Sequence, residues 1–177
     1  MKELNRFVWY LAKRAAVILL VLTLGVFVFY YAMNASNINI VLKDGMALRA
    51  KVIMMDEDSD DLTRYFGEEW LLRDENLQQA LRGESPYKLY IVRGIDHRIT
   101  LNWFFCLPWD TTATVTFTER IPRVDGRLNG NYLEWAQSLF GDSYQEVPAW
   151  PEATYRASLV KVDGQWKIRS LSMVGGE

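Results

Sequence analysis

The sequence predicts an α+β fold: one N-terminal transmembrane helix, followed by helices packed on a curved antiparallel sheet with a cone-like shape. Three observations indicate this. Residues 15–33 are an apolar run without a charge. Residues 44–83 place apolar side chains at three- and four-residue spacings, which is typical of helices. After residue 86 the spacing changes to two, which is typical of half-buried antiparallel strands.

The apolar run is long enough to cross a membrane. As a helix, residues 15–33 would rise about 28 Å, close to the hydrocarbon thickness of a bilayer. The flanks are asymmetric: Lys2, Arg6, Lys13 and Arg14 precede the run against one Glu3, and no charge follows it until Lys43. Since cytoplasmic flanks are positive, we expect a single-pass protein of the cell membrane with its N-terminus inside.

This orientation divides the chain into four parts. We predict a cytoplasmic tail at 1–14, a transmembrane helix at 15–33, a linker at 34–43 and an extracytoplasmic α+β domain at 44–177. The alternative is a cleaved signal peptide, whose apolar core is about 7–15 residues with small residues at positions −3 and −1. Here the core is longer, and Ala32 and Ala35 are three residues apart. An uncleaved signal anchor is therefore favoured.

Composition limits the function of the outer part. The chain has 20 Lys and Arg and 22 Asp and Glu, of which four basic residues and Glu3 precede the span, so the outer part has a net charge of −5. This charge argues against nucleic acid and against binding to an anionic lipid surface. The one cysteine, Cys106, cannot form an internal disulfide. Seven Trp, nine Tyr and eight Phe can supply the core instead.

Helices are expected first in the outer domain. Asp44 is placed to cap a helix that runs to Met55, and residues 62–70 follow with apolar side chains on one helical face. The helical pattern continues at 77–81, and Gly83 occupies the position that commonly ends a helix.

Strands follow the helices. We expect them at 87–93, at 99–107 and around Val115. Turns are expected at 125–126 and 129–130, and a short helix at 131–140, ended by Gly141. The last pair of strands, 153–162 and 165–174, forms a hairpin across Asp163-Gly164, because Asp-Gly between strand-like runs is a strong hairpin signal.

Three parts of the outer domain carry a resemblance to a known family. They are the predicted helix 61–72, the strands around Trp103 and Val115, and the closing hairpin 155–168 with its Asp-Gly-Gln-Trp-Lys-Ile end. Together they resemble the nuclear-transport-factor-2-like superfamily. Some membrane members of that superfamily are called cystatin-like. The resemblance covers most of residues 44–174 and implies helices packed on a cone-shaped sheet. The segment 121–151 fits the pattern less well.

Two polar features of the sequence are candidates for chemistry. Asp56, Asp58 and Asp60 have the spacing of the first ligands in a calcium loop, but Asp61 stands where the loop needs Gly. We therefore expect Ser59 or Asp58 to cap the next helix, and we predict no metal. The sole histidine, His97, follows Asp96 in a predicted turn, and we interpret it as a polar turn residue.

Enzymes that resemble this fold, such as ketosteroid isomerase and scytalone dehydratase, line the cone with an acid or base. The residues to consider are Asp96, His97, Asp110, Tyr87 and Tyr90. None matches a catalytic motif, so we predict no catalytic residue and no cofactor. Cys106 is expected to be a small buried apolar residue.

Aromatic residues provide the remaining signal. We expect them to fill the core, with an apolar pocket as the alternative; they are Trp103, Phe105, Phe117, Trp135, Phe140 and Trp166. Trp109 and Trp150 each lie beside a proline in a predicted loop and are candidates for an exposed partner contact. With Asp96 and His97 they complete the partner or pocket candidates.

These features favour a non-catalytic function. The layout of a short inner tail, one span and an outer domain resembles inner-membrane assembly subunits of secretion and conjugation machines and some membrane-anchored sporulation and cell-envelope proteins. The resemblance implies a membrane-anchored scaffold or assembly domain of a bacterial envelope complex, which acts by protein–protein interaction. Its partners would be the lipid bilayer, through residues 15–33, and other membrane or envelope proteins, with a homo-oligomer left open. The alternatives are a small hydrophobic ligand-binding module in the cone pocket and, less favoured, an isomerase or hydrolase.

Overall fold

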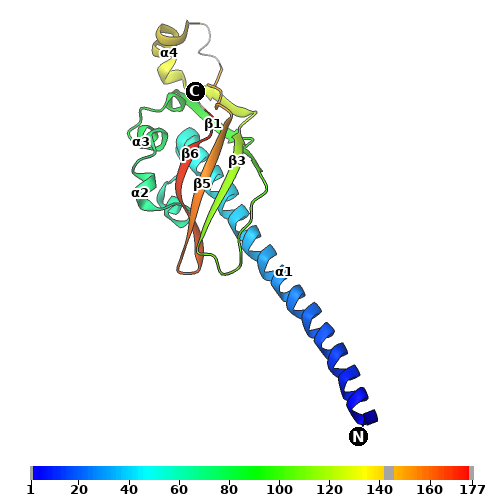
Figure 1. The fold of residues 1–177 in the computed structure, drawn as a ribbon. Coiled ribbons are helices and arrows are strands. Elements are labelled where there is room, and N and C mark those ends of the chain that lie inside the picture. Colours follow the sequence, from blue (N-terminus) through cyan, green and yellow to red (C-terminus); the bar gives the residue numbers. More distant parts are fainter. Residues whose placement is uncertain (1, 142–145, 176–177) are drawn as a thin grey trace.

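One long helix contains almost a third of the residues of the chain. The computed structural model describes residues 2–141 and 146–175. Helix α1, Lys2–Met55, has 54 residues, which corresponds to a length of about 80 Å. Its N-terminal half projects away from the rest of the chain, and its C-terminal half lies behind the sheet (Figure 1).

The other elements are short. The helices are α2 (Glu68–Leu71), α3 (Glu75–Leu81) and α4 (Leu133–Phe140); the strands are β1 (Tyr90–Ile95), β2 (Arg98–Leu101), β3 (Thr112–Arg120), β4 (Val124–Leu128), β5 (Ala153–Val162) and β6 (Gln165–Met173). The strands form a four-stranded antiparallel sheet, in the order β2-β3-β5-β6, and a two-stranded antiparallel pair of β1 and β4. The α+β class is therefore confirmed.

The projecting half of α1 is a candidate membrane span. Among the described residues it belongs to the one helix that is long and apolar enough to cross a bilayer. Apolar side chains are exposed on opposite sides of this part of the helix, as Leu20 and Leu22 illustrate with exposed fractions of 60% and 61%. At its N-terminal end, Lys13 and Arg14 lie over the rings of Trp9 and Tyr10.

The predicted linker at 34–43 is wrong, because these residues are helical and continuous with the candidate span. Asp44, predicted to cap a new helix, lies inside α1. The reason is burial: Ile38, Leu42 and Met46 recur every four residues on one face and are fully buried in the core. This packing outweighs the weak helix propensity of the Asn- and Ser-rich segment after the span.

The sheet covers this face of α1. On β3, Val115 and Phe117 point inward and are fully buried, as the alternation predicts. The closing hairpin is also confirmed, and its turn residues Asp163 and Gly164 both have positive φ. Phe66 adds a parallel bridge to Ile168 at the β6 edge of the sheet.

Several predicted boundaries are wrong. Residues 62–70 are not one helix but a 3₁₀ turn at Asp60–Arg64 followed by α2, because the chain straightens at Phe66 to pair with β6. Another 3₁₀ turn, Pro86–Leu89, replaces the start of the strand predicted at 87–93. The turn predicted at 125–126 lies within β4, where Gly126 pairs with Val92.

The acidic run precedes a 3₁₀ turn instead of the helix that Ser59 or Asp58 was expected to cap. The Asp58 carboxylate accepts a hydrogen bond from the Asp60 amide at 3.0 Å, whereas Ser59 makes no side-chain cap. The strand predicted at 99–107 ends at Leu101, and residues 102–111 form a loop. Trp103 and Phe105 therefore do not join the core.

Replacing Gly45 with alanine is expected to destabilise the domain. An added Cβ would lie 2.8 Å from the Tyr65 Cβ, which cannot move without its backbone. Overpacking of this kind costs about 1–3 kcal/mol, which exceeds the gain of about 1 kcal/mol in helix propensity. Thermal unfolding in detergent measures the loss. Gly25→Ala is the matched control, because nothing lies within 4 Å of that Cβ; equal Tm values for the two variants would contradict the close packing.

Candidate functional site

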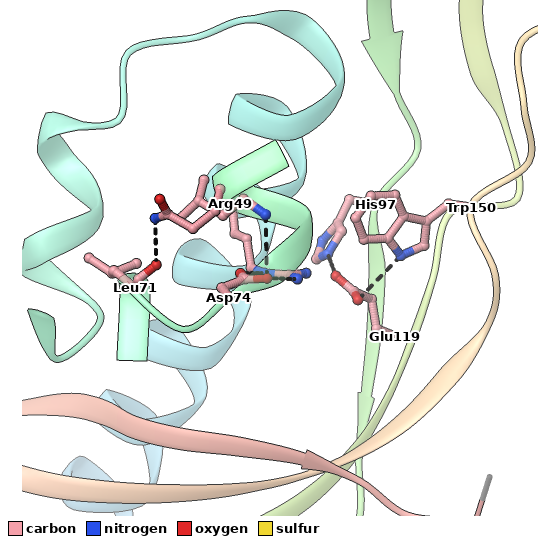
Figure 2. A network of polar contacts seen from close by, with 8 residues as sticks. Arg49, Leu71, Asp74, His97, Glu119 and Trp150 are labelled. Carbon is pink, nitrogen blue, oxygen red and sulfur yellow. Dashed lines mark hydrogen bonds and ion pairs between the residues drawn. The ribbon is translucent and has the colours of Figure 1, made fainter. Parts of the chain in front are cut away.

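A group of buried polar side chains connects α1 to the sheet (Figure 2). It comprises Arg49 on α1, Asp74 at the start of α3, His97 between β1 and β2, Glu119 on β3 and Trp150 before β5. We call these five residues the buried network. Glu119 is fully buried, and Arg49 and Asp74 are 4% and 7% exposed.

Arg49 and Asp74 form a bidentate ion pair. Arg49 Nη2 donates to Asp74 Oδ1 at 2.9 Å, and Arg49 Nε donates to the other carboxylate oxygen. Burial lowers the pKa of Arg49, but the hydrogen bond and the charge of Asp74 offset this, so the net pKa is raised. Arg49 therefore stays charged inside the core.

Aromatic rings surround the Arg49 guanidinium. Its Cζ lies 5.7 Å from the ring centroid of Trp70 and 5.8 Å from that of Trp150. Both distances are within the range of cation–π attraction. Among the described residues, Arg49 Nη1 has no hydrogen-bond partner, so the rings stabilise a charge that hydrogen bonds satisfy only in part.

Asp74 has a second role in local structure. Its carboxylate accepts a hydrogen bond from the Leu77 amide at 3.4 Å, so it caps α3. A carboxylate at this position also lies favourably against the helix dipole. The start of α3 thus holds the partner of Arg49 in place.

Glu119 forms the second half of the network. Its Oε1 lies 2.9 Å from His97 Nε2, and its Oε2 accepts from Trp150 Nε1 at 3.4 Å. Glu119 continues the inward alternation of Val115 and Phe117 on β3, which places a carboxylate in the core. Burial raises the pKa of Tyr155, and the nearby charge of Glu119 raises it further. The charge of Glu119 also favours the charged form of Arg49.

Two predicted site residues lie elsewhere than expected. His97 was predicted to be a polar turn residue, but its side chain is only 6% exposed because it points at Glu119. Trp150 was predicted to be exposed in a loop, but it is 8% exposed because its ring packs beside Tyr87 and Arg49. The structure thus brings His97 and Trp150 together in the buried network.

The other two candidates lie at the surface. Asp96 pairs with Arg98 at 2.6 Å, and this hydrogen bond lowers the pKa of the Asp96 carboxyl. Trp109 is 67% exposed. Of the residues considered for chemistry, Tyr87 is buried, and burial raises its pKa. Asp110 accepts from the Leu107 amide within its loop at 2.7 Å.

Sequence reasoning missed Arg49, Asp74 and Glu119. Signals for two of them were present: Glu119 follows Val115 and Phe117 at even spacing, and Asp74 precedes Leu77 at the spacing of a helix cap. Arg49 offered a weaker signal, because a basic residue in an amphipathic helix usually faces water. Its burial depends on a partner 25 residues away.

The aromatic predictions divide into two groups. Phe117 and Trp166 are buried as expected, whereas Trp103, Phe105 and Trp135 are exposed. The side chain of Phe140 lies outside the described part of the chain.

Asn34 is the first residue of α1 after the predicted span, and its side chain joins α1 to the end of the domain nearest that span. Asn34 Nδ2 donates to the Leu107 carbonyl at 3.0 Å, and Asn34 Oδ1 accepts from Trp166 Nε1 at 2.8 Å. Asn34 and Trp166 are 6% and 3% exposed. The loop 102–111 and β6 are therefore anchored at the point where α1 leaves the domain.

The buried network lies apart from a pocket at the surface of the domain. A surface pocket of about 300 Å³ beside the end of α1 is lined by residues such as Met55, Leu81 and Ile91, and none of the network residues lines it. In the described chain, no group of three His, Cys, Asp or Glu residues could hold a metal ion. The network instead fixes α1, α3 and β3 relative to one another.

Cys106 is expected to react slowly with thiol reagents. The residue is 1% exposed, as expected of a small buried side chain, and burial raises the pKa of its thiol. Since the thiolate is the reactive form, maleimide at pH 7 should modify native protein far more slowly than urea-unfolded protein. Mass spectrometry of both reactions measures the difference; equal rates would place Cys106 at the surface.

Comparisons with known proteins give no family. A scan against protein-family models finds no match, and a search of curated proteins finds none either.

Proposed function

We propose that this chain is a single-pass membrane protein whose C-terminal domain acts as a scaffold in a bacterial envelope complex. The observation that carries the proposal is the continuity of α1, which includes the candidate span and also supplies the core stripe Ile38, Leu42 and Met46. A domain on such a helix stays close to the bilayer. This confinement raises its effective concentration for partners anchored in the same membrane.

The contacts of Asn34 support an uncleaved anchor. Signal cleavage near Ser36 would remove Asn34 and leave Trp166 Nε1 and the Leu107 carbonyl without this partner. Unsatisfied buried polar groups cost about 1–3 kcal/mol each. The basic residues before the span and the uncharged segment 34–42 after it support an N-terminus inside and a domain outside.

The outer face of the four-stranded sheet is the proposed docking surface for the envelope partner. Its cross-strand pairs are rich in hydroxyls, as in Thr114 with Ser158 and Ser158 with Ser170, and Arg156 is exposed among them. Helix α1 lies on the opposite face, and α2 and α3 lie beside the sheet (Figure 1). A hydroxyl-rich face with a cation suits a partner that supplies hydrogen-bond acceptors and carboxylates.

The nuclear-transport-factor-2-like resemblance remains part of the proposal. A helix packed on a mostly antiparallel sheet, closed by the Asp-Gly hairpin, is consistent with it. The surface pocket beside α1 bears on the ligand-binding alternative, and its lining mixes apolar side chains with Asp56, Arg82 and Lys88. Nothing in that lining favours a hydrophobic ligand over a protein partner.

The experiment is purification of the tagged full-length chain from membranes in mild detergent, with mass spectrometry of the co-purifying proteins. We expect a stoichiometric set of membrane or envelope proteins, reduced severalfold by Arg156→Glu. Arg127→Glu is the matched control, because Arg127 is an exposed arginine on β4, outside the four-stranded sheet. A chain that purifies alone, or equal recovery with both variants, would contradict the proposed surface.

A further inference from the structure

The loop at residues 102–111 exposes three large aromatic side chains at the end of the domain nearest the candidate span. Trp103, Phe105 and Trp109 are 85%, 59% and 67% exposed. Trp103 and Phe105 lie beside each other, with ring centroids 6.4 Å apart. Aromatic side chains grouped in this way on a soluble surface mark an interaction site.

This loop lies alongside the candidate membrane span. The Trp109 ring is 5.9 Å from the ring of Phe27, and the Phe105 ring is 5.5 Å from that of Tyr31. The Tyr31 hydroxyl also donates to the Phe104 carbonyl at 3.5 Å. Phe27 and Tyr31 both belong to the predicted span 15–33, so the loop contacts its outer end.

Helix geometry gives the depth of this contact. Phe27 precedes Met33, the last residue of the predicted span, by six positions, or about 9 Å along the axis. Elements that lie in a membrane interface bury their apolar face about 5–10 Å into the boundary between headgroups and acyl chains. If residues 15–33 span the bilayer, the Trp109 ring therefore lies within that layer.

The loop is held rigidly against the helix. Asn34 Nδ2 donates to the Leu107 carbonyl, and the Asp110 carboxylate accepts from the Leu107 amide. At the end of the loop, the Lys161 amide of β5 donates to the Thr111 carbonyl at 2.8 Å. The loop cannot withdraw from the span without breaking the contact between Asn34 and the Leu107 carbonyl.

We propose that residues 102–111 form an interfacial membrane loop, which inserts Trp103, Phe105 and Trp109 into the outer leaflet beside the transmembrane helix. The inference rests on the proposed anchor. Tryptophan is favoured at this depth because its ring is apolar and its N–H can reach water or headgroups. Asp110 is the only charged residue in the loop. The occupant is therefore a zwitterionic lipid surface, since anionic lipids are recruited by basic clusters.

The loop has a consequence for the scaffold. One transmembrane helix leaves a domain free to rotate and tilt, whereas a second contact beside the helix restricts both. Interfacial aromatic residues set helix tilt and rotation in this way. The outer face of the sheet would then be presented to neighbouring proteins in a fixed direction along the membrane.

The test measures the depth of the loop in full-length protein reconstituted in phosphatidylcholine vesicles. In a Cys106→Ala background, an environment-sensitive fluorophore is attached at Thr111→Cys, which is exposed and retains all three aromatic side chains. Matched labels are placed at Leu20→Cys in the span and at Trp135→Cys on α4, an exposed aromatic position at the far end of the domain (Figure 1). Quenching by lipids with spin labels along their acyl chains reports depth.

We expect emission at position 111 to be blue-shifted and quenched severalfold more than at position 135. The same quenching at 111 and 135, with strong quenching at 20, would overturn the loop proposal and leave the anchor intact. No quenching at position 20 would overturn both. Crosslinking of position 111 to another membrane protein in native membranes, without lipid quenching, would show a protein partner instead and also overturn the proposal.

Discussion

Replacing Asp74 with alanine is expected to destabilise the domain by about 3–5 kcal/mol, because it leaves the Arg49 charge buried without its partner. Arg49 is 4% exposed, so its charge cannot reach water without opening the core. The loss of the α3 cap at Leu77 adds to the effect. Chemical unfolding in detergent, followed by near-ultraviolet circular dichroism, measures the change.

Two controls test whether the loss of stability depends on the burial of the ion pair. Arg82→Ala breaks a pair whose side chains are 57% and 59% exposed, and exposed pairs contribute about 0–1 kcal/mol. The double variant Arg49→Met with Asp74→Leu should recover much of the stability, because apolar residues of similar volume can replace a buried ion pair. If Asp74→Ala were no more harmful than Arg82→Ala, Arg49 would not be charged and buried as described.

Replacing Glu119 with leucine is expected to cost about 3 kcal/mol. Glu119 accepts from Trp150 Nε1 and pairs with His97 Nε2, and hydrogen bonds to charged groups contribute about 1.5–3 kcal/mol each. The variant gains apolar burial but leaves two polar groups unsatisfied. Unfolding under the same conditions as for Asp74→Ala gives the magnitude.

Glu119→Gln provides the conservative comparison. Glutamine keeps the volume and one acceptor oxygen, so it should retain part of the stability that leucine loses. Equal stability of wild type and Glu119→Leu would show that the carboxylate contributes no net stability to the core.

Local patterns in the sequence predicted much of the sheet. The hairpin follows from Asp163-Gly164, which adopt the positive φ angles that such turns require. The inward alternation on β3 is also a local pattern. In contrast, the strand predicted at 99–107 ends at Leu101. A two-residue spacing of apolar side chains in an aromatic-rich segment does not distinguish a strand from a loop that lies against an exposed helix.

Long-range contacts explain most of the remaining errors. The helix at 34–43 depends on packing under the sheet, which a local reading of Asn and Ser cannot reveal. His97 and Glu119 are 22 residues apart, and Trp166 reaches Asn34 across 132 residues. The buried network was therefore not predictable as a site, although Asp74 and Glu119 each carried a local signal.

The measurement that tests the account most directly is the topology of the full-length chain in intact cells. In the Cys106→Ala background, single cysteines at Asn5 and Glu152, both exposed in the structure, are treated with a membrane-impermeant maleimide after removal of any outer permeability barrier. We expect the chain to remain in carbonate-washed membranes, with Glu152→Cys labelled in intact cells and Asn5→Cys labelled only after lysis. Release by carbonate, or the opposite labelling pattern, would contradict a domain held outside the cell membrane on α1.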